Sequence, residues 1–420
     1  MIEIKNLPKE RAMLIALDTK EFSKEIVEEH IDELEELADT AGAETVFKVI
    51  QSKRGIDPAF YIGKGKAEEL AQLIELNEIN IVIFDDDLTA VQVRNLEKLF
   101  NRKVIDRSGL ILDIFASRAK TKEAKTQVEL AQLQYMLPRL TRAWTHLSKQ
   151  YGGIGTKGPG ETQIETDRRL IRTRISVLKD KLEKIEAHRQ TQSSGRKNFV
   201  KIAIAGYTNA GKSTLFNLLT QANVFAEDKL FATLDSTTRA LEIDETQKIL
   251  ISDTVGFIRK LPAHLVASFK STLNEVREAD IILHVIDLSH PYYEDHIKVV
   301  DETLKEFGSA EKRVIKVFNK VDLIKDKSII DYVKNIYNDS VLISASRGIN
   351  ISSLRGMIKK ILDENIIEEN IELPINASKK ASQIHNFADV LKTNYDEDKI
   401  QITYRTSKQN AEKIKKIISL

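Results

Sequence analysis

The chain has 420 residues, which is too many for one ordinary hydrophobic core and predicts two to four domains. It contains no cysteine, and this excludes a disulfide framework and any thiolate metal site. No apolar run approaches the roughly 18 residues of a membrane-spanning helix, and the start "MIEIKNLPKE" lacks a signal-peptide pattern, so we expect a cytoplasmic protein.

The net charge of +1 conceals an uneven distribution along the chain. Residues 1–115 carry 15 Lys and Arg against 24 Asp and Glu, a balance of −9. Residues 116–195 carry 16 against 8, a balance of +8. The basic segment indicates an anionic partner, and a solvated helical surface is the alternative that charge leaves open.

The first 115 residues alternate short apolar runs with amphipathic stretches. The apolar runs at 13–17, 45–50, 80–84 and 103–105 are typical of strands. The amphipathic stretches at 23–39, 66–78 and 89–100 are typical of helices. This alternation predicts an N-terminal domain, residues 1–115, with a parallel α/β sheet.

Residues 116–195 have a helical period throughout. Apolar residues follow spacings of three and four in two seams, Leu130, Leu133, Leu137, Leu140, Trp144 and Leu147 in the first and Ile164, Ile171, Ile175, Leu178, Leu182 and Ile185 in the second. These seams predict two helices packed as in a coiled coil, with Pro138 bending the first. Between them "YGGIGTKGPG" (151–160) holds five of the 17 glycines, so we expect a helical hairpin with a glycine-rich tip loop.

The second half of the chain begins after a polar linker at 190–198. The α/β alternation resumes and predicts a domain over residues 196–363. The acidic stretch "DENIIEEN" (363–370) reads as another linker. Residues 371–420 then predict a small α+β domain, with strands at 387–393 and 399–405 and a basic helix at 408–419.

The stretch "GYTNAGKS" (206–213) follows a predicted strand and opens a predicted helix, the setting that a phosphate-binding loop requires. Gly206 and Gly211 let backbone amides turn toward phosphates, and the helix N-terminus adds partial positive charge. We expect Lys212 to reach the β- and γ-phosphates and the Ser213 hydroxyl to bind Mg²⁺.

Two strand ends continue this pattern. "ILISDTVG" (249–256) places Asp253 where it can hold the Mg²⁺ shell through water, and the Gly256 amide where it can sense the γ-phosphate. "VIKVFNKVD" (314–322) ends with Asp322, which can accept both the N1 and N2 hydrogens of guanine. Adenine does not offer this pair of hydrogens. We expect Asn319 and Lys320 to brace the base and the phosphate loop.

The last motif is "VLISAS" (341–346), whose backbone can meet guanine O6. Each of these short motifs alone reads as ordinary strand-end punctuation, but their order and intervals together predict a guanine-nucleotide site. The predicted GTP-binding residues are Gly206, Tyr207, Thr208, Asn209, Ala210, Gly211, Lys212, Ser213, Phe231, Ala232, Thr233, Leu234, Asp235, Asp253, Thr254, Val255, Gly256, Asn319, Lys320, Val321, Asp322, Ser344, Ala345 and Ser346.

Between the first two motifs, "KLFATLDSTTR" (229–239) offers three threonines to the metal. We choose Thr233, with Ser213, as the Mg²⁺ ligands, which makes this loop a switch that is ordered by the γ-phosphate. Thr237 and Thr238 are nearby alternatives, and an ordinary surface loop is the alternative for all three.

Phe257 stands where many GTPases have the glutamine that orients the attacking water, so no catalytic residue is assigned and basal hydrolysis should be slow. The Asn209 side chain could hold a K⁺ ion, with turn stabilisation as the equal alternative. "YIGKGKAEEL" (61–70) is interpreted as a helix entry or an RNA contact rather than a second nucleotide site. "FDDDL" (84–88) is interpreted as solvated or capping acids rather than a metal site.

With these residues assembled, the chain resembles the HflX family of GTPases. The segments that carry the resemblance are "YIGKGK", "LILDIFASRA", "EAKTQVELAQLQYMLPRLT", "GGIGTKGPGETQIETDRR", "FATLDSTTR" and "DTVGFIRKLP", which lie within residues 1–346. The family usually has proline where this chain has Ser236, a departure inside the first switch loop. The last 55 or so residues vary in the family and carry little resemblance.

The resemblance implies a P-loop GTPase domain at 196–363 and a cytosolic, Mg²⁺-dependent enzyme whose low GTPase rate ribosomes stimulate. It also implies binding of GTP or GDP and of the large (50S) ribosomal subunit with its rRNA, and splitting of stalled or idle ribosomes under stress. We expect a monomer, partly associated with ribosomes or a membrane surface. A ribosome-assembly GTPase and a non-ribosomal regulatory GTPase are the alternatives.

The hairpin is where we expect rRNA to bind, near the peptidyl-transferase centre. Basic side chains on its arms and tip would meet phosphates and make binding fall steeply with salt. The candidates are Arg139, Arg142, Lys157, Arg168, Arg169 and Arg172.

Overall fold

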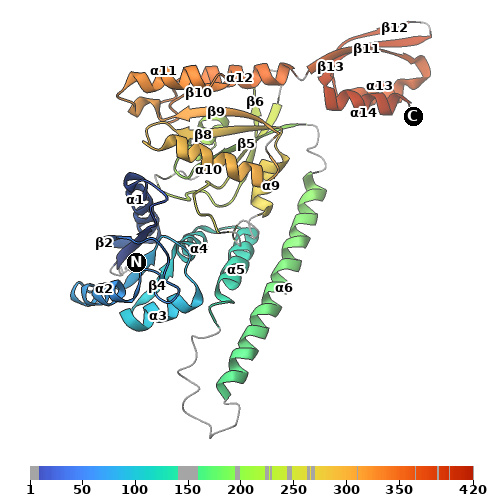
Figure 1. Ribbon diagram of the computed structural model, residues 1–420. Helices are drawn as coiled ribbons and strands as arrows, with labels where there is room; N and C mark the ends of the chain where they lie inside the picture. Colours follow the sequence, from blue (N-terminus) through green and yellow to red (C-terminus); the bar gives the residue numbers. More distant parts are fainter. Residues whose placement is uncertain are drawn as a thin grey trace, which may run out of the picture.

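A computed structural model of the chain describes residues 9–140, 159–193, 199–222, 227, 229–243, 248–262, 265, 270–309, 311–364, 366–385, 387–396 and 398–419. Three β-sheets organise this part of the chain, and two long helices lie beside the first two sheets (Figure 1). The mixed α/β class predicted from the sequence is confirmed.

The first sheet has four parallel strands in the order β2-β1-β3-β4. The strands are β1 (Glu10–Asp18), β2 (Ala43–Ser52), β3 (Ile81–Phe84) and β4 (Lys103–Asp106), and the helices α1 (Lys24–Ala41), α2 (Lys64–Leu76) and α3 (Ala90–Phe100) connect them. Each of these elements was predicted. A further helix, α4 (Arg107–Arg118), was not; it begins at once after β4 because the Asp106 side chain caps it by accepting from Gly109 N at 2.9 Å.

The two arms of the hairpin are α5 (Lys122–Met136) and α6 (Pro159–Ser193), and α6 runs beside α5 (Figure 1). Leu130 and Leu178 of the two seams are buried. The expectation that Pro138 bends the first helix is wrong, because α5 ends at Met136. Proline disfavours a helical residue before it and cannot donate the next hydrogen bond, so it stops the helix here. Leu140 lies in a turn, and Trp144 and Leu147 lie outside the described residues.

The second sheet has six strands in the order β10-β9-β8-β5-β7-β6, and we call it the G sheet. Its strands are β5 (Val200–Gly206), β6 (Thr237–Glu242), β7 (Lys248–Asp253), β8 (Ile281–Asp287), β9 (Arg313–Asn319) and β10 (Ser340–Leu342); only β6 runs antiparallel to its neighbour. The helices are α7 (Lys212–Thr220), α9 (Lys270–Glu278), α10 (Tyr293–Glu306), α11 (Lys327–Ile336) and α12 (Ile351–Glu364). Loops at the carboxyl ends of the parallel strands carry the predicted nucleotide motifs, as expected for such sheets.

Both predicted linkers are shorter than expected. The first loses residues 190–193 to α6, which continues to Ser193. The second, at 363–370, is largely a strand, because β11 (Ile366–Pro374) pairs antiparallel with β13 (Lys399–Ser407) over its whole length. Ile371 and Leu373 pack in the core, whereas Glu368 and Glu372 are exposed on the other face, so the acidic residues concealed the strand.

The third sheet is completed by β12 (Asp389–Tyr395) at the other side of β13, in the order β11-β13-β12. The helices α13 (Ser378–Ile384) and α14 (Lys408–Ser419) pack against it. The predicted strands and the basic terminal helix are present, while β11 and α13 were not predicted.

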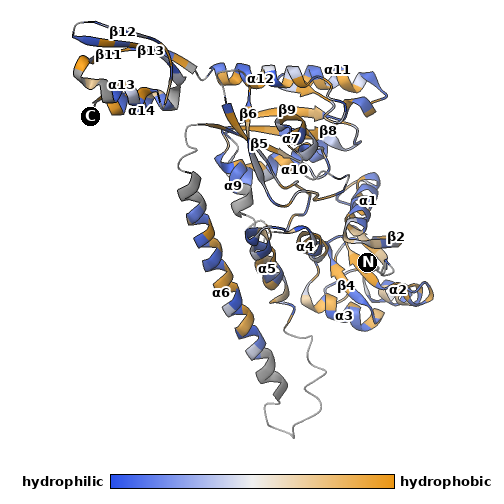
Figure 2. Cartoon of the chain, turned by 180° about the vertical axis from the view of Figure 1, so that it is seen from behind, coloured by the Kyte–Doolittle hydropathy of each residue, from blue (hydrophilic) through white to orange (hydrophobic). Residues whose placement is uncertain are grey.

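Hydropathy follows these elements closely. The strands of the first two sheets are apolar, and the outward faces of α6, α11 and α12 carry polar residues (Figure 2). Among the described helices, none combines the length and the apolar character needed to cross a bilayer.

Candidate functional site: a phosphate loop between two switch segments

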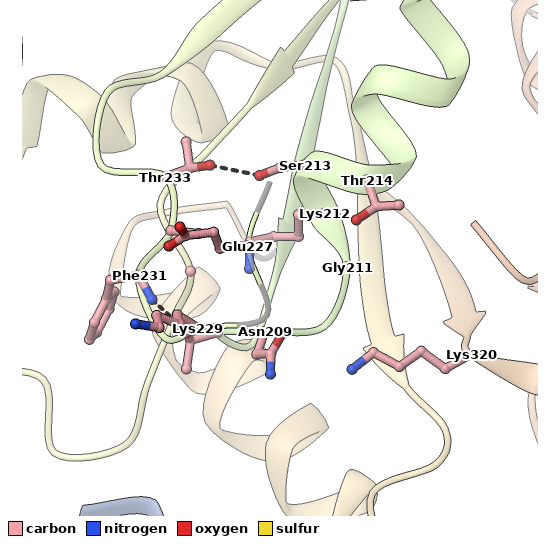
Figure 3. Close-up of a pocket in the computed structure, with 13 residues that line it drawn as sticks. Asn209, Gly211, Lys212, Ser213, Thr214, Glu227, Lys229, Phe231, Thr233 and Lys320 are labelled. Atoms are coloured by element: carbon pink, nitrogen blue, oxygen red, sulfur yellow. Dashed lines mark hydrogen bonds between the residues drawn. The ribbon is translucent and has the colours of Figure 1, made fainter. Parts of the chain in front are cut away.

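The predicted phosphate loop joins β5 to α7, as the sequence indicated (Figure 3). Gly211 has φ 89°, and a Cβ there would lie 2.3 Å from Asn319 Nδ2, so only glycine fits. Lys212 is buried and donates from Nζ to Tyr207 O at 2.7 Å. Burial lowers the pKa of Lys212 to about 8. Its ammonium group is therefore held inside the loop, where a phosphate would relieve the cost of burial.

Three oxygen-bearing side chains meet beside this loop. Ser213 Oγ lies 2.6 Å from Thr233 Oγ1 and donates to Asp253 Oδ2 at 2.7 Å. Asp253 Oδ1 is buried without a hydrogen-bond partner, and burial raises the pKa of this carboxyl group. Hydroxyl and carboxylate oxygens are the ligands that Mg²⁺ prefers, and the unpaired Oδ1 is a place for one of its waters. The residues fit the Mg²⁺ that P-loop GTPases generally use.

Only one of the three candidate threonines lies at this point. Thr233 touches Ser213, while Thr237 and Thr238 belong to β6 and pair with β7. The Thr238 hydroxyl lies 2.8 Å from Ser252 Oγ, in the sheet and away from the loop. The geometry therefore favours Thr233.

A pocket opens over the loop (Figure 3). Its lining residues are Thr208, Asn209, Gly211, Lys212, Ser213, Thr214, Glu227, Lys229, Phe231, Ala232, Thr233, Gly256 and Lys320. Glu227, Lys229 and Thr214 were not among the predicted binding residues, because they belong to no short motif. Asn209 has φ 59°, which agrees with its turn-forming role; the K⁺ site stays a prediction.

Residues 254–262 follow β7, and we call them the second switch segment; Gly256 and Phe257 bring this segment against the phosphate loop. A Cβ at Gly256 would lie 2.8 Å from Thr208 Cα and 2.9 Å from Lys212 Nζ, so the backbone approaches closely only because the residue is glycine. Phe257 is 1% exposed and its backbone exchanges hydrogen bonds with Gly206 and Thr208. The ring packs in the core with Tyr207 and Phe231 rather than facing the pocket. It is therefore a packing residue, in agreement with the expectation that it cannot orient water.

The guanine motifs are linked to the phosphate loop through Asn319. Its Nδ2 donates to Ala210 O, and its Oδ1 accepts from Ala345 N, each at 2.9 Å. One side chain thus holds the phosphate loop and the 344–346 loop together, and its bond to Ala210 agrees with the expectation that Asn319 braces the phosphate loop. Lys320 pairs with Asp287 at 2.7 Å, and Arg347 Nε lies 3.7 Å from Asp322 Oδ2. These contacts position Asp322 at the strand end where the base is expected.

One predicted binding residue has another role. Asp235 does not line the pocket, because its carboxylate accepts hydrogen bonds from Lys120 and Thr121 at the start of α5. The first switch loop therefore has two faces, with Thr233 toward the phosphate loop and Asp235 toward the hairpin.

Sequence reasoning missed a buried ionic cluster at the second switch segment. Arg259 pairs with Glu33 at 3.1 Å, and Lys260 pairs with Asp85 at 2.6 Å. Arg107, which is 1% exposed, pairs with Glu33 and with Asp85. We call these five residues the switch II cluster. Tyr207 of the phosphate loop also donates to Glu33, so the N-terminal sheet and the nucleotide site share one set of buried charges.

A second group lies in the same interface. Donor atoms of Glu29, His290 and His296 lie within 4.8 Å of one another, and His296 Nε2 is 3.8 Å from Glu29 Oε1. The His296 ring stacks on Tyr207 with centroids 3.8 Å apart. We interpret this group as interface packing. Burial lowers the pKa of His290, and burial with Arg259 nearby lowers that of His30 to about 3.

The candidate RNA residues have different positions. The predicted RNA role of Arg139 is corrected by its contacts. Its guanidinium group lies over the Tyr135 ring, donates to Leu88 O and pairs with Asp106 at 2.6 Å. Arg139 therefore holds the end of α5 to the N-terminal sheet. Arg168, Arg169 and Arg172 lie on α6, and the last two are exposed. Arg142 and Lys157 lie outside the described residues.

Two weaker motifs have structural roles. Gly63 precedes α2, which begins at Lys64, so the interpretation of "YIGKGK" as a helix entry is confirmed. In "FDDDL", Asp85 and Asp86 pair with Lys260. The two carboxylates therefore belong to an interface, whereas the sequence predicted solvated or capping acids.

Family models match three consecutive segments of the chain. Residues 28–116 match the family described as GTP-binding GTPase N-terminal, residues 118–196 match the GTP-binding GTPase middle region, and residues 201–320 match the 50S ribosome-binding GTPase family. A solved GTP-binding protein from Sulfolobus solfataricus in complex with GDP is 27% identical, with 84% of this chain and 99% of that chain covered and a TM-score of 0.45.

Curated relatives match over almost the whole length. GTPase HflX of Caldanaerobacter subterraneus subsp. tengcongensis is 44% identical over 412 residues, which cover 98% of this chain and 94% of that protein. GTPase HflX of Escherichia coli is 41% identical over 383 residues, covering 90% and 89%. At this identity over almost its whole length, the chain belongs to the HflX family of GTPases.

Proposed function

We propose that this chain is a GTP-hydrolysing switch that binds the large ribosomal subunit and separates stalled or idle ribosomes into subunits under stress. The observation that carries the proposal is the attachment of a basic helical hairpin, α5 and α6, beside the first switch loop. The match of residues 201–320 to a family described as 50S ribosome-binding GTPase supports the ribosomal partner.

Hydrolysis would use the residues around the loop. Bound Mg²⁺ would neutralise developing charge on the phosphate oxygens, held by Ser213 and Thr233 with Asp253 behind a water. Lys212 adds a positive charge from inside the loop, and the Gly256 amide lies against it. The Phe257 side chain cannot orient the attacking water, so we expect a slow basal rate of hydrolysis that rises at least tenfold with large subunits.

The hairpin would be the part that meets rRNA. The segment 116–195 has a charge balance of +8, and Arg169 and Arg172 are exposed on the arm that leads to the glycine-rich tip. Arginine side chains at such positions suit phosphate contacts, and glycine residues, which have no side chain, suit entry into a crowded RNA cavity. We therefore propose that residues 151–160 act in splitting itself.

The test replaces Gly152–Gly160 with a short Gly-Ser linker. We expect the melting temperature and basal GTP hydrolysis to stay near wild type, because a hairpin tip contributes few buried contacts. Ribosome splitting and ribosome-stimulated hydrolysis should be lost. Splitting at the wild-type rate would show that the loop is a passive connector and would remove it from the mechanism.

The two alternatives give different results with the unmodified protein. A ribosome-assembly GTPase would bind free large subunits and leave intact ribosomes unsplit. A non-ribosomal regulatory GTPase would bind neither. Splitting of intact ribosomes that depends on GTP supports the proposal over both.

A further inference from the structure

The first switch loop is attached to the hairpin at one carboxylate. Asp235 Oδ1 accepts from Thr121 Oγ1 at 2.6 Å, and Oδ2 accepts from Lys120 N at 3.1 Å and Thr121 N at 3.3 Å. Thr121 is also the N-cap of α5, since its hydroxyl oxygen accepts from Ala124 N at 3.0 Å. The Asp235 carboxylate thus sits at the positive end of α5, where a negative charge is favoured.

Asp235 is two residues from the predicted Mg²⁺ ligand. Thr233 Oγ1 meets Ser213 Oγ at 2.6 Å on one side of the loop, and Asp235 binds α5 on the other. Leu234 between them is 3% exposed and packs in the core. A segment this short cannot move at Thr233 without moving at Asp235, because two intervening peptide bonds are planar and leave little slack.

Two further contacts join the same loop to the end of α4. The rings of Phe231 and Phe115 meet edge to face with centroids 4.7 Å apart. Arg118 pairs with Glu227 at 3.0 Å. The loop is therefore attached at three points, and the other side of the Phe231 backbone is bound to the phosphate loop, through its N–H to Thr208 Oγ1 at 2.9 Å.

Movement of α5 would be transmitted to α6. Glu129 of α5 pairs with Arg174 of α6 at 2.6 Å, and Leu130 and Leu178 of the two helices are buried. Packed helices shift as units, because close-packed side chains resist continuous deformation.

We propose that Asp235 is the positioning residue that couples the first switch loop to α5, so that closure of Thr233 on Mg²⁺ and the γ-phosphate sets the placement of the hairpin. The contact transmits the nucleotide state and takes no part in binding or hydrolysing GTP. This inference rests on the proposed function only for what the hairpin touches; the coupling itself belongs to the isolated chain.

The test measures the distance between the hairpin and the G sheet by spin-label spectroscopy, without ribosomes. The chain has no cysteine, so Lys181→Cys on α6 and Lys334→Cys on α11 provide two unique labelling sites. We expect the distance distribution to differ between saturating GDP and a non-hydrolysable GTP analogue. In Asp235→Ala, we expect at least half of that difference to disappear.

Thr89→Ala is the control, since it removes the side-chain cap at the N-terminus of another helix, α3, whose cap bonds do not involve either switch segment. It should keep the full nucleotide-dependent difference. Thr121→Ser retains the hydroxyl group and should also retain the full nucleotide-dependent difference in distance. If Asp235→Ala melts below the assay temperature, Asp235→Asn, which loses the charge at nearly the same volume, carries the test with the same two outcomes.

A full wild-type difference in the Asp235 variant would overturn the coupling, and so would a wild-type distance that does not depend on the nucleotide. Failure of the proposed function has another signature. A distance change that requires Asp235, in a protein that binds no large subunit, would leave the coupling intact and remove the ribosomal role.

Discussion

At the scale of single residues, the choice of base depends on Asp322. We expect Asp322→Asn to lower GTP affinity at least tenfold and to raise affinity for xanthosine nucleotides, because the amide can pair with the xanthine carbonyl. Asp326→Asn, four residues later at the cap of α11, is the control and should retain guanine preference. Binding is measured by calorimetry with GTP, XTP and ATP. Equal affinity of the wild-type site for ATP and GTP would refute the assignment.

Glu33 holds the switch II cluster together from the N-terminal side. Its removal leaves Arg107 and Arg259 with Asp85 as their remaining shared carboxylate, and breaking a buried ion pair by removing one partner costs about 3 kcal/mol or more. In Glu33→Ala, amide hydrogen exchange in α4 should therefore accelerate roughly 100-fold. Glu35→Ala on the same helix, whose carboxylate is 41% exposed, should change exchange by less than threefold. Equal rates in the two variants would show that the cluster contributes no stability.

Residue-level chemistry was predictable where it is local. The 206–213 loop and the strand-end motifs are contiguous patterns, so their positions in the fold followed from the sequence. The switch II cluster was not predictable, since Arg259 and Glu33 are 226 positions apart and neither belongs to a charge pattern that identifies the other. Asp235 was assigned to the nucleotide for a related reason. A motif shows which loop contains a residue, but the direction of its side chain depends on the element packed against it.

At the scale of elements, the interface between α1 and α10 should respond to pH. The pKa of His30 is lowered to about 3, so this imidazole stays neutral in the fold while the unfolded chain takes up a proton below about pH 6.5. The unfolded state therefore binds more protons between these values, and stability should fall with falling pH. Between pH 7.0 and 5.5 the loss from this group is about 1 kcal/mol.

The measurement is hydrogen exchange of α1 amides at pH 7.0 and 5.5, corrected for the intrinsic exchange rate. His30→Gln, which cannot take up a proton, should show a smaller pH dependence than wild type. His385→Gln, at an exposed position at the end of α13, is the control and should behave as wild type. The same pH dependence in all three proteins would exclude His30 as its source.

The hairpin gives a prediction about charge. Arg169→Glu with Arg172→Glu should weaken binding to large subunits at least tenfold and make it less sensitive to salt, since fewer phosphates are neutralised. Lys327→Glu with Lys334→Glu, an equal charge change on α11, should leave the affinity for large subunits and its salt dependence nearly unchanged. Binding is followed by sedimentation between 50 and 200 mM salt. Identical salt slopes for the two double variants would place the RNA contact elsewhere.

Element boundaries were predictable where the apolar period was clear, and not where a single residue or a pairing partner decided them. Pro138 ended α5 rather than bending it, because proline cannot donate the next hydrogen bond and disfavours a helical residue before it. The stretch 363–370, which contains the start of β11, was interpreted as a linker because its acidic residues outnumber its apolar ones. Its pairing with β13, which the sequence does not announce, makes it a strand.

At the scale of the whole molecule, three parts meet at one nucleotide site. The first switch loop contacts α5 through Asp235, the second contacts the N-terminal sheet through Arg259 and Lys260, and Tyr207 of the phosphate loop donates to Glu33. A γ-phosphate that orders both switches would therefore act on the hairpin and the N-terminal sheet together. This arrangement supports the proposed coupling between the nucleotide state and the placement of the basic hairpin.

The central claim is that GTP, and not GDP, prepares this chain to act on the large ribosomal subunit. The most direct measurement is sedimentation through a sucrose gradient of the protein mixed with intact ribosomes, with a non-hydrolysable GTP analogue or with GDP. In the presence of the analogue, we expect the protein to sediment with the 50S peak, and the 70S peak to decrease as the 30S and 50S peaks grow. With GDP it should stay near the top of the gradient. Protein at the top with both nucleotides, or equal binding with both, would contradict the account.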